Sequence, residues 1–316
     1  MDRALLFLYA ETPVHVGADT SRGGLDLPIQ REITTGFPII KAESLKGALR
    51  ERFRPERDRG TDRDRWARIF GDEPPSAGVR AGALRPGTLR VHEAQLVAFP
   101  APAMARTFVW VTSPLAQARL ERKARLAGVR VATEGTTAPA LIPDDAACVG
   151  AGPAAGQFVI GPYTVSTSQD PAFGNWATQL AHVAFPALDE LAFFKDKLAA
   201  DLFACSDDLL GAISRDCAPV VARVQLGTGE QDSAPRKTVQ HGPFYSEYLP
   251  AETLLAALLE CDDSEHLDYL TSTLNDGVLR IGGDETLGKG LLWCRVLSPS
   301  TAGQHPAEQA VAGADR

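Results

Sequence analysis

The sequence lacks the marks of secreted, membrane-spanning and zinc-caged proteins. Its five cysteines lie far apart without a CxxC pair, which argues against a zinc cage or a disulfide framework and predicts reduced, mostly buried thiols. The apolar run near the start is too short for a signal peptide and has an acidic flank. No later segment approaches the length of a membrane span. We therefore expect a cytoplasmic protein with no membrane partner.

The sequence also lacks an excess of positive charge. A net charge of -8 excludes a protein that coats nucleic acid over its whole surface, since phosphate binding depends on basic side chains. Any nucleic-acid site must be local. Residues 41–68 contain ten Lys and Arg against six Asp and Glu, a local surplus of four. Mixed charge runs of this kind are more often solvated faces than binding sites.

The length and the apolar content predict one elaborated α+β domain. The chain has 316 residues, of which 44% are hydrophobic, enough for a core with large insertions. The pattern predicts a buried strand at 4–10, strands at 88–99 and 106–112, a helix at 114–128, helical material at 185–214, a helix from 252, and strands at 278–282 and 291–297. We expect the domain to cover 1–297 and the small, polar residues 298–316 to form a disordered tail. Strands interleaved with helices favour an antiparallel sheet with helices on one face, and the ferredoxin-like arrangement is the preferred member of that class.

A helix between Ser44 and Pro55 has two distinct sides. Leucine, alanine and phenylalanine repeat at helical spacing on one side, while Lys46, Arg50 and Arg54 repeat every fourth residue on another. The charged run 56–66 that follows has weak periodicity and is interpreted as a flexible excursion. This basic side is a candidate contact for a phosphate backbone.

The long loop at 15–38 carries the candidate catalytic residues. Loops of this length in compact domains are usually functional or disordered. Asp26 follows two glycines, and its carboxylate could ligate a hard divalent metal or accept a proton from a ribose 2′-hydroxyl. A lone loop aspartate is more often a turn residue or simply solvated. His15 could act as an acid or base, although a lone histidine beside a strand end is more often structural.

The loop GGDETLGKG at 282–290 is rich in glycine and could let a phosphate chain approach backbone N–H groups closely, with Thr286 and Lys289 alongside. It is not a nucleotide-hydrolase phosphate loop, because Gly290 stands where serine or threonine is required. The loop is equally typical of a tight connection between two strands. The β-like runs 220–226 and 242–248, separated by a polar segment, predict a protruding hairpin.

Together these segments resemble a known family. The chain shows ETPVHVGADTSRGGLDLPIQREITTGFPIIKAESLKGALR after a strand, then IFGDE, FVWVTSPL, FYSEYLP and IGGDETLGKG. This order is similar to that of Cmr-type backbone subunits of type III-B CRISPR ribonucleoproteins, in the RAMP superfamily. The likeness spans residues 4–297. It implies an RRM-like (ferredoxin-like) palm with large insertions and a β-hairpin thumb at 220–248.

The resemblance implies an RNA-guided ribonuclease. Copies of such subunits stack along a guide RNA with the other Cmr subunits, and each copy cuts the bound target RNA in a reaction that depends on Mg²⁺ or Mn²⁺. Asp26 matches the cleaving and possible metal-binding aspartate, and His15 a position near it. By the same resemblance the regions that hold RNA include Lys46, Arg50, Arg54, Thr286, Gly288, Lys289 and Gly290.

Two other functions stay open. One is a scaffold that binds guide RNA and leaves cutting to its partners. The other is a guide-processing RAMP ribonuclease, which needs a histidine rather than Asp26. This sequence also departs from the family, since Ser246 replaces an acid commonly found beside Glu247.

Overall fold

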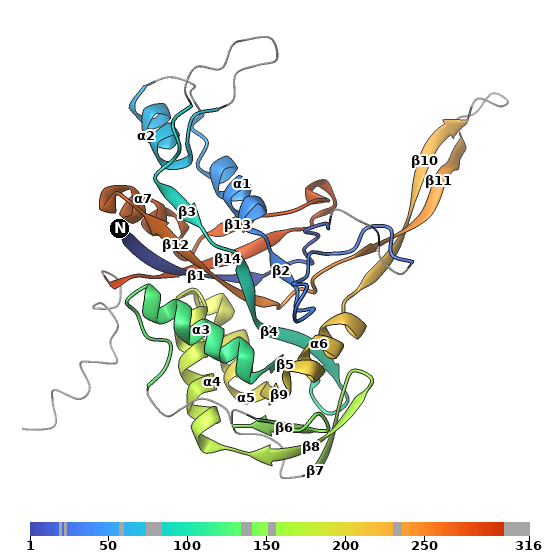
Figure 1. Cartoon of the computed structure of the whole chain (residues 1–316). Helices are drawn as coiled ribbons and strands as arrows, with labels where there is room; N and C mark the ends of the chain where they lie inside the picture. The colour runs from blue at the N-terminus through green and yellow to red at the C-terminus, as the bar shows by residue number, and fades with distance from the viewer. Residues whose placement is uncertain are drawn as a thin grey trace, which may run out of the picture.

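The computed structural model describes residues 1–18, 21, 24–56, 60–73, 84–133, 141–150, 156–229 and 236–299, with the backbone alone at 225–229 and 236–241. A 12-stranded sheet runs through the molecule in the order β13-β14-β1-β12-β4-β5-β9-β6-β8-β7, with β2 paired to β4 and β3 to β12 (Figure 1). The mixed α+β class expected from the sequence is confirmed. The expected disordered tail falls almost wholly on residues outside the described part of the chain.

The first half of the sheet is antiparallel and carries helices α1 and α7. In chain order its elements are β1 (Asp2–Ala10), β2 (Ile39–Ile40), α1 (Ala42–Arg52), β3 (Leu89–Val91), β12 (Leu254–Cys261), α7 (Ser264–Leu274), β13 (Val278–Arg280), the short helix η2 (Glu285–Leu287) and β14 (Leu291–Leu297). Strand β1 lies between β12 and β14, with Leu5 opposite both Leu258 and Leu297. Strand β3 pairs on the far side of β12.

Strand β1 is a continuous apolar run because both of its faces are covered. Ala4, Leu6 and Leu8 belong to the core beneath α1 and α7, whereas Leu5 and Phe7 belong to the core beneath α3 and α4. All of these side chains are fully buried. A strand buried on both faces has no reason to alternate polar and apolar residues. The sequence pattern at 4–10 therefore predicted this strand correctly.

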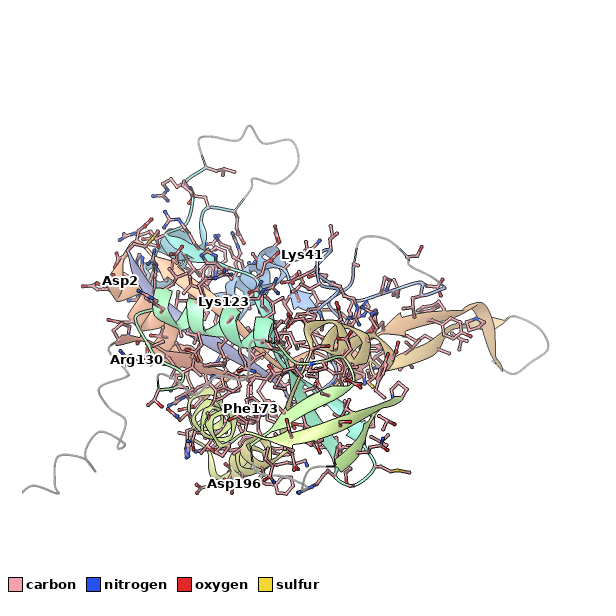
Figure 2. All side chains as sticks on the ribbon, turned by 60° about the horizontal axis from the view of Figure 1, so that its bottom comes forward. Asp2, Lys41, Lys123, Arg130, Phe173 and Asp196 are labelled. Atoms are coloured by element: carbon pink, nitrogen blue, oxygen red, sulfur yellow. The ribbon has the colours of Figure 1, made fainter. Side chains whose placement is uncertain are left out.

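The second half of the sheet forms a lobe below the first in Figure 1. Its elements are β4 (Ala94–Ala103), β5 (Thr107–Thr112), α3 (Pro114–Leu126), β6 (Ala146–Val149), β7 (Gly156–Ile160), β8 (Tyr163–Gln169), α4 (Pro171–Ala184), η1 (Asp189–Leu191), α5 (Ala192–Asp201), β9 (Leu202–Cys205) and α6 (Asp207–Asp216). Strand β4 belongs to both halves, since it pairs with β12 and with β5. Phe173, labelled in Figure 2, is fully buried where α4 packs on this lobe.

Three interpretations of the sequence were wrong. Residues 61–70 form helix α2 (Thr61–Phe70) rather than a flexible excursion, because Trp66, Ile69 and Phe70 are buried. The segment after Glu252 is strand β12, and the helix begins only at Ser264, where Asp263 accepts hydrogen bonds from the first turn. A short apolar run covered on both faces is not distinguished from a helix by periodicity alone. Strands β6 and β9 were also missed, and β9 lies within the stretch 185–214 that was predicted to be helical.

The protruding hairpin is confirmed, and its two strands are longer than the runs 220–226 and 242–248 expected from the sequence. It consists of β10 (Val220–Gly229) and β11 (Arg236–Glu247), which pair with each other outside the main sheet. Their register shifts twice, between Arg223 and Leu226. Figure 1 shows the hairpin extending well beyond the body of the molecule.

The remaining expectations concern cysteines and the membrane. All five cysteines are free thiols, and four of them are buried. Within the part of the chain that the structure describes, no helix is both long and apolar enough to cross a bilayer.

Candidate functional site at the hairpin foot

Three segments from distant parts of the sequence meet where the hairpin joins the body. We call this region the hairpin foot. It consists of residues 245–249 and of the loop segments 14–18 and 26–30, which pair with them. Val14 and Leu249 exchange backbone hydrogen bonds of 2.9 and 2.8 Å. Leu27 forms a parallel bridge to Ser246, and Gly17 an antiparallel bridge to Ile29. This part of the long loop is therefore held by backbone pairing rather than hanging free.

Asp26 lies on the exposed edge of the hairpin foot. Its Oδ2 accepts a 2.7 Å hydrogen bond from the backbone N–H of Tyr245. The next residue, Leu27, donates its N–H to the Tyr245 carbonyl at 3.0 Å. The carboxylate is thus anchored through one oxygen while the side chain remains exposed to solvent. An anchored, solvated carboxylate can accept a proton or a hydrogen bond from a ligand that reaches this edge.

A buried ion pair joins the loop to the hairpin at the hairpin foot. Arg31 Nη2 contacts Glu247 Oε1 at 2.7 Å, and the two side chains are only 8% and 6% exposed. Glu247 Oε2 accepts the N–H of Ile29 at 3.0 Å. Arg31 also donates to the carbonyls of Gly36 and Ser214 at 3.0 and 2.9 Å. The sequence did not predict a role for Arg31, because its partner Glu247 lies 216 positions away and no local sequence pattern connects the two residues.

His15 lies at the same foot but contacts a different residue. Its Nδ1 is 2.8 Å from the Glu247 carbonyl oxygen, and because that oxygen only accepts, Nδ1 is the donor. The ring lies 5.4 Å from that of Tyr248, and the side chain is nearly buried. Among the hydrogen bonds of the described residues, none joins His15 to Asp26. The geometry favours the structural role for His15 that the sequence left open.

The glycine-rich loop is tied to the hairpin by a second ion pair. Asp284 Oδ2 accepts hydrogen bonds from Arg223 Nη1 at 2.6 Å and from the Tyr248 hydroxyl at 2.9 Å. Burial alone raises the pKa of Asp284, but the hydrogen bonds from Tyr248 and Arg223 outweigh it and lower the pKa. Lys289 Nζ lies 5.5 Å from the centre of the Tyr248 ring. The predicted RNA-binding residue Lys289 is therefore beside the hairpin foot.

The backbone of this loop is mostly occupied by internal hydrogen bonds. The N–H groups of Gly283, Leu287, Gly288, Lys289 and Gly290 donate to His15, Asp284, Glu285, Asp284 and Pro13 respectively. The expectation that these amides are free to bind a phosphate is therefore wrong for these five residues. The alternative, a tight connection between β13 and β14, describes the loop correctly. Thr286 and Gly288 are exposed on its outer side.

The predicted basic side of α1 is largely engaged within the protein. Lys46 Nζ donates to the Leu89 carbonyl at 2.9 Å, and burial, followed by the nearby Arg50 and Arg90, lowers its pKa. The guanidinium carbons of Arg50 and Arg54 lie 4.4 and 5.4 Å from the centre of the Trp66 ring. Glu73 takes a 3.0 Å contact from Arg54. Arg50 and Arg54 hold α2 against α1, whereas Lys46 contacts β3.

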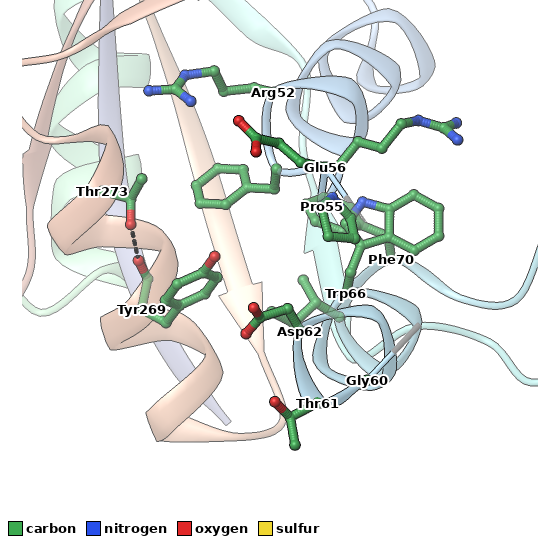
Figure 3. A pocket seen from close by; sticks show the side chains of 13 residues that line it. Arg52, Pro55, Glu56, Gly60, Thr61, Asp62, Trp66, Phe70, Tyr269 and Thr273 are labelled. Atoms are coloured by element: carbon green, nitrogen blue, oxygen red, sulfur yellow. Dashed lines mark hydrogen bonds between the residues drawn. The ribbon is translucent and has the colours of Figure 1, made fainter. Parts of the chain in front are cut away.

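A pocket of about 690 Å³ lies beside this cluster, between the end of α1, α2 and α7 (Figure 3). Trp66 on α2 and Tyr269 on α7 line it, together with Pro55 and Thr273. Trp66 is nearly buried, so its ring serves mainly to pack the helices together. The structure does not link this pocket to Asp26 through any contact among the described residues.

The residues near Asp26 do not by themselves fit a resident metal ion. Within the described ranges there is no group of three His, Cys, Asp or Glu side chains placed to hold one. A hard divalent cation takes six or more oxygen ligands, of which a single exposed carboxylate supplies at most two.

Comparisons with known proteins agree with this architecture. The model of the RAMP superfamily matches residues 7–293. The CRISPR system Cmr endoribonuclease Cmr4 of Pyrococcus furiosus is 29% identical over 299 residues, covering 92% of this chain and 95% of that protein. The crystal structure of oligomeric Cmr4 from Pyrococcus furiosus has a TM-score of 0.67 at 23% identity, covering 94% and 98% of the two chains. A chain in the cryo-EM structure of the type III-B Cmr-beta complex bound to cognate target RNA has a TM-score of 0.65 at 20% identity, covering 94% and 97%. The resemblance seen in the sequence motifs is confirmed.

Proposed function

Because this chain belongs to the RAMP superfamily, we propose that it is a backbone subunit of a type III-B CRISPR effector, which binds guide RNA and cuts bound target RNA once per copy. The observation that carries the proposal is the Asp26 carboxylate, exposed and anchored by the Tyr245 N–H at the root of a protruding hairpin. The similarity to a protein named as an endoribonuclease supports it.

The proposed division of labour follows the fold. Elements β1–α1–β3–β12–α7–β14 pair in the spatial order β14-β1-β12-β3, which is the order of a ferredoxin-like palm. The hairpin β10–β11 is the thumb, which separates target from guide. Residues 1–297 form one domain in this proposal, with the β5–β9 lobe as an insertion.

The proposed reaction is an in-line attack by the target 2′-hydroxyl on the adjacent phosphorus. The 2′-oxygen–phosphorus bond forms, and the bond from phosphorus to the 5′-oxygen breaks. Asp26 accepts the 2′-hydroxyl proton, and water protonates the departing 5′-oxygen, because the edge is open to solvent. The anchoring bond from Tyr245 N–H holds one carboxylate oxygen so that the other faces the strand. His15 positions this edge by holding the Glu247 carbonyl.

The proposed partners are RNA and protein. Further copies of the chain stack head to tail along guide RNA, together with the other subunits of the complex, in the cytoplasm. A heterologous contact of this kind forms open helical arrays. The structures of oligomeric Cmr4 and of the Cmr-beta complex with target RNA support this assembly.

The test is cleavage of a labelled target RNA by the guide-loaded complex with wild type, Asp26→Asn and Asp26→Ala. Asparagine keeps an oxygen that can accept from Tyr245 N–H, so Asp26→Asn removes the charge while preserving the anchor. We expect cuts at regular spacing to fall by about 100-fold or more in both variants, with target binding retained. Each reaction is run with and without Mg²⁺ or Mn²⁺, which tests the expected dependence on a divalent cation. Unchanged cutting by Asp26→Asn would refute the role of Asp26.

Two alternatives differ from this proposal in what they require. A scaffold that only binds guide RNA is selected by guide binding without target cleavage. A guide-processing ribonuclease needs a histidine at the scissile phosphate. His15 is nearly buried and its Nδ1 is engaged, which disfavours that role.

A further inference from the structure

One carboxylate oxygen of the glycine-rich loop contacts both strands of the hairpin. Asp284 Oδ2 accepts a hydrogen bond from Arg223 Nη1 on β10 at 2.6 Å. The same oxygen accepts from the hydroxyl of Tyr248, directly after the end of β11, at 2.9 Å. The side chains of Arg223 and Asp284 are 25% and 14% exposed. We call these three residues the hairpin clamp.

Strand β10 depends on the hairpin clamp for its attachment to the body. The hairpin pairs only with itself and stands outside the main sheet (Figure 1). Within 220–224, the part of β10 whose side chains are described, Arg223 alone makes a side-chain hydrogen bond to the body. The valines of that stretch, Val220, Val221 and Val224, are between 44% and 49% exposed. The end of β11 is held separately, because Leu27 donates its N–H to the Tyr245 carbonyl.

Arg223 lies at the outer end of the regular part of the hairpin. It is opposite Phe244, and the pairing from there toward the body is regular. On the other side of Arg223 the register shifts twice. Phe244 directly precedes Tyr245, whose N–H anchors the Asp26 carboxylate. The hairpin clamp therefore holds the part of the hairpin that carries the Asp26 anchor.

The backbone of Asp284 indicates that its carboxylate serves the hairpin rather than its own loop. Its φ is +64°, in the left-handed region that glycine adopts most readily. Its side chain makes no capping hydrogen bond to η2, the short helix that it precedes. A glycine would suit this backbone, so the conformation of the loop does not account for an aspartate here.

We propose that Asp284 is a positioning residue for the cut at Asp26. By binding Arg223 and Tyr248 it sets the orientation of the hairpin, and the Tyr245 N–H then keeps the Asp26 carboxylate in place against the bound strand. This inference rests on the proposed cleavage at Asp26. A displacement of about 1 Å can slow a reaction about 100-fold, so loss of the clamp lowers the rate of cutting rather than the affinity for RNA.

The first experiment measures the orientation of the hairpin in the free full chain. Spin labels are attached through Thr228→Cys on β10 and Leu126→Cys on α3, in a chain that also carries Cys217→Ser because the other four cysteines are buried. Pulsed electron paramagnetic resonance gives the distribution of distances between the two labels. We expect a narrow distribution in the parent chain and a markedly broader one when Asp284→Gly is added.

The second experiment measures single-turnover cutting of a saturating labelled target RNA by the guide-loaded complex. Asp284→Gly and Arg223→Gln are each expected to slow cutting roughly tenfold or more, while target affinity changes by less than about twofold. The double variant cuts about as slowly as Asp284→Gly alone, because both changes remove the same contact. Asp284→Asn suits the left-handed backbone and keeps an oxygen for both donors, so it restores most of the rate.

The matched control is Asp276→Gly. Asp276 also has a left-handed φ, +60°, and contacts Arg295 at 3.0 Å with side chains that are 29% and 12% exposed. It lies in the turn between α7 and β13, and none of its described hydrogen bonds reaches the hairpin. Asp276→Gly therefore removes a comparable ion pair from the body and is expected to leave both the distance distribution and the cutting rate unchanged.

The outcomes separate the inference from the function on which it rests. If the wild-type complex does not cut the target, or Asp26→Asn cuts normally, the proposed function fails and the positioning role fails with it. If Asp26 carries the cut but Asp284→Gly cuts at the wild-type rate or keeps a narrow distance distribution, the function stands and the role of Asp284 is refuted. Equal slowing by Asp276→Gly would attribute the loss to stability alone, which also refutes that role.

Discussion

Removing the Glu247 carboxylate is expected to destabilise the protein and to displace Asp26. Glu247 is the only described partner that Arg31 has for a full ion pair, and both side chains are almost completely buried. The same carboxylate accepts the N–H of Ile29, and the Glu247 backbone N–H donates to the Leu27 carbonyl at 2.9 Å. Glu247 therefore holds Leu27 and Ile29 in place, and these two residues directly follow Asp26 in the loop.

The magnitude follows from what Glu247→Ala leaves behind. Breaking a buried ion pair by removing one partner costs about 3–5 kcal/mol, because the remaining charge is buried without compensation. Arg31 keeps its hydrogen bonds to Gly36 and Ser214, which places the expected loss at the lower end, about 3 kcal/mol. Glu247→Gln keeps an oxygen for the Ile29 N–H, so its loss is smaller, about 1–2 kcal/mol.

The assay is urea unfolding of the full chain, followed by fluorescence of its four tryptophans. The control is Asp262→Asn, which breaks the two-bond pair with Arg90 whose side chains are 50% and 49% exposed. An exposed ion pair contributes little to stability because water screens it, so the control loses far less than Glu247→Ala. If Glu247→Ala unfolds at the same urea concentration as Asp262→Asn, the buried pair does not support the hairpin foot as argued. In the guide-loaded complex, Glu247→Ala is also expected to reduce target cleavage under conditions in which it remains folded.

Two further predictions concern a carboxyl group and a loop. Burial raises the pKa of Glu252 to about 7, so the folded state holds more protons than the unfolded state between about pH 4.5 and 7, and stability falls as pH rises through that window. Glu252→Gln should therefore raise the free energy of unfolding at pH 8 by an amount on the order of 1 kcal/mol and change it little at pH 4. A lower free energy of unfolding for the variant at pH 8 would contradict the burial argument. Gly290→Ala should cost more than about 2 kcal/mol, because its Cβ meets the Ile281 carbonyl, whereas Gly288→Ala, with a similar positive φ but open space, should cost about 1 kcal/mol. Equal melting temperatures for the two alanine variants would show that the close contact at Gly290 is relieved without cost.

Local sequence signals predicted the parts of the site that depend on local structure. The two glycines before Asp26 and the proline after it indicated a loop, and the residue is exposed in a loop. The fourfold spacing correctly placed Lys46 and Arg50 on α1, whereas Arg54 lies beyond the end of that helix at Arg52. Helical periodicity indicates which residues share a side of a helix, but it does not indicate what that side contacts.

The parts that the sequence did not predict depend on long-range pairing. Arg31 and Glu247 are brought together by the return of β11 to the loop, and no spacing rule connects them. The partners of the basic side of α1 include Trp66, in a segment interpreted as flexible because its charged residues masked a three-residue buried face. Strand β12 was taken for a helix because both of its faces are covered by other elements.

Pairing within the protein decides which cations of this acidic chain are available to an anionic partner. The surplus of four positive charges at 41–68 suggested a basic helix. The predicted cations, however, already contact Trp66, Glu73 and the Leu89 carbonyl within the protein. Releasing them to bind phosphate requires breaking contacts that hold α2. Arg52 and Arg280 incur no such cost, because they have no partner in the described structure. The count of basic residues in a segment is therefore a poor guide to which cations lack a partner within the protein.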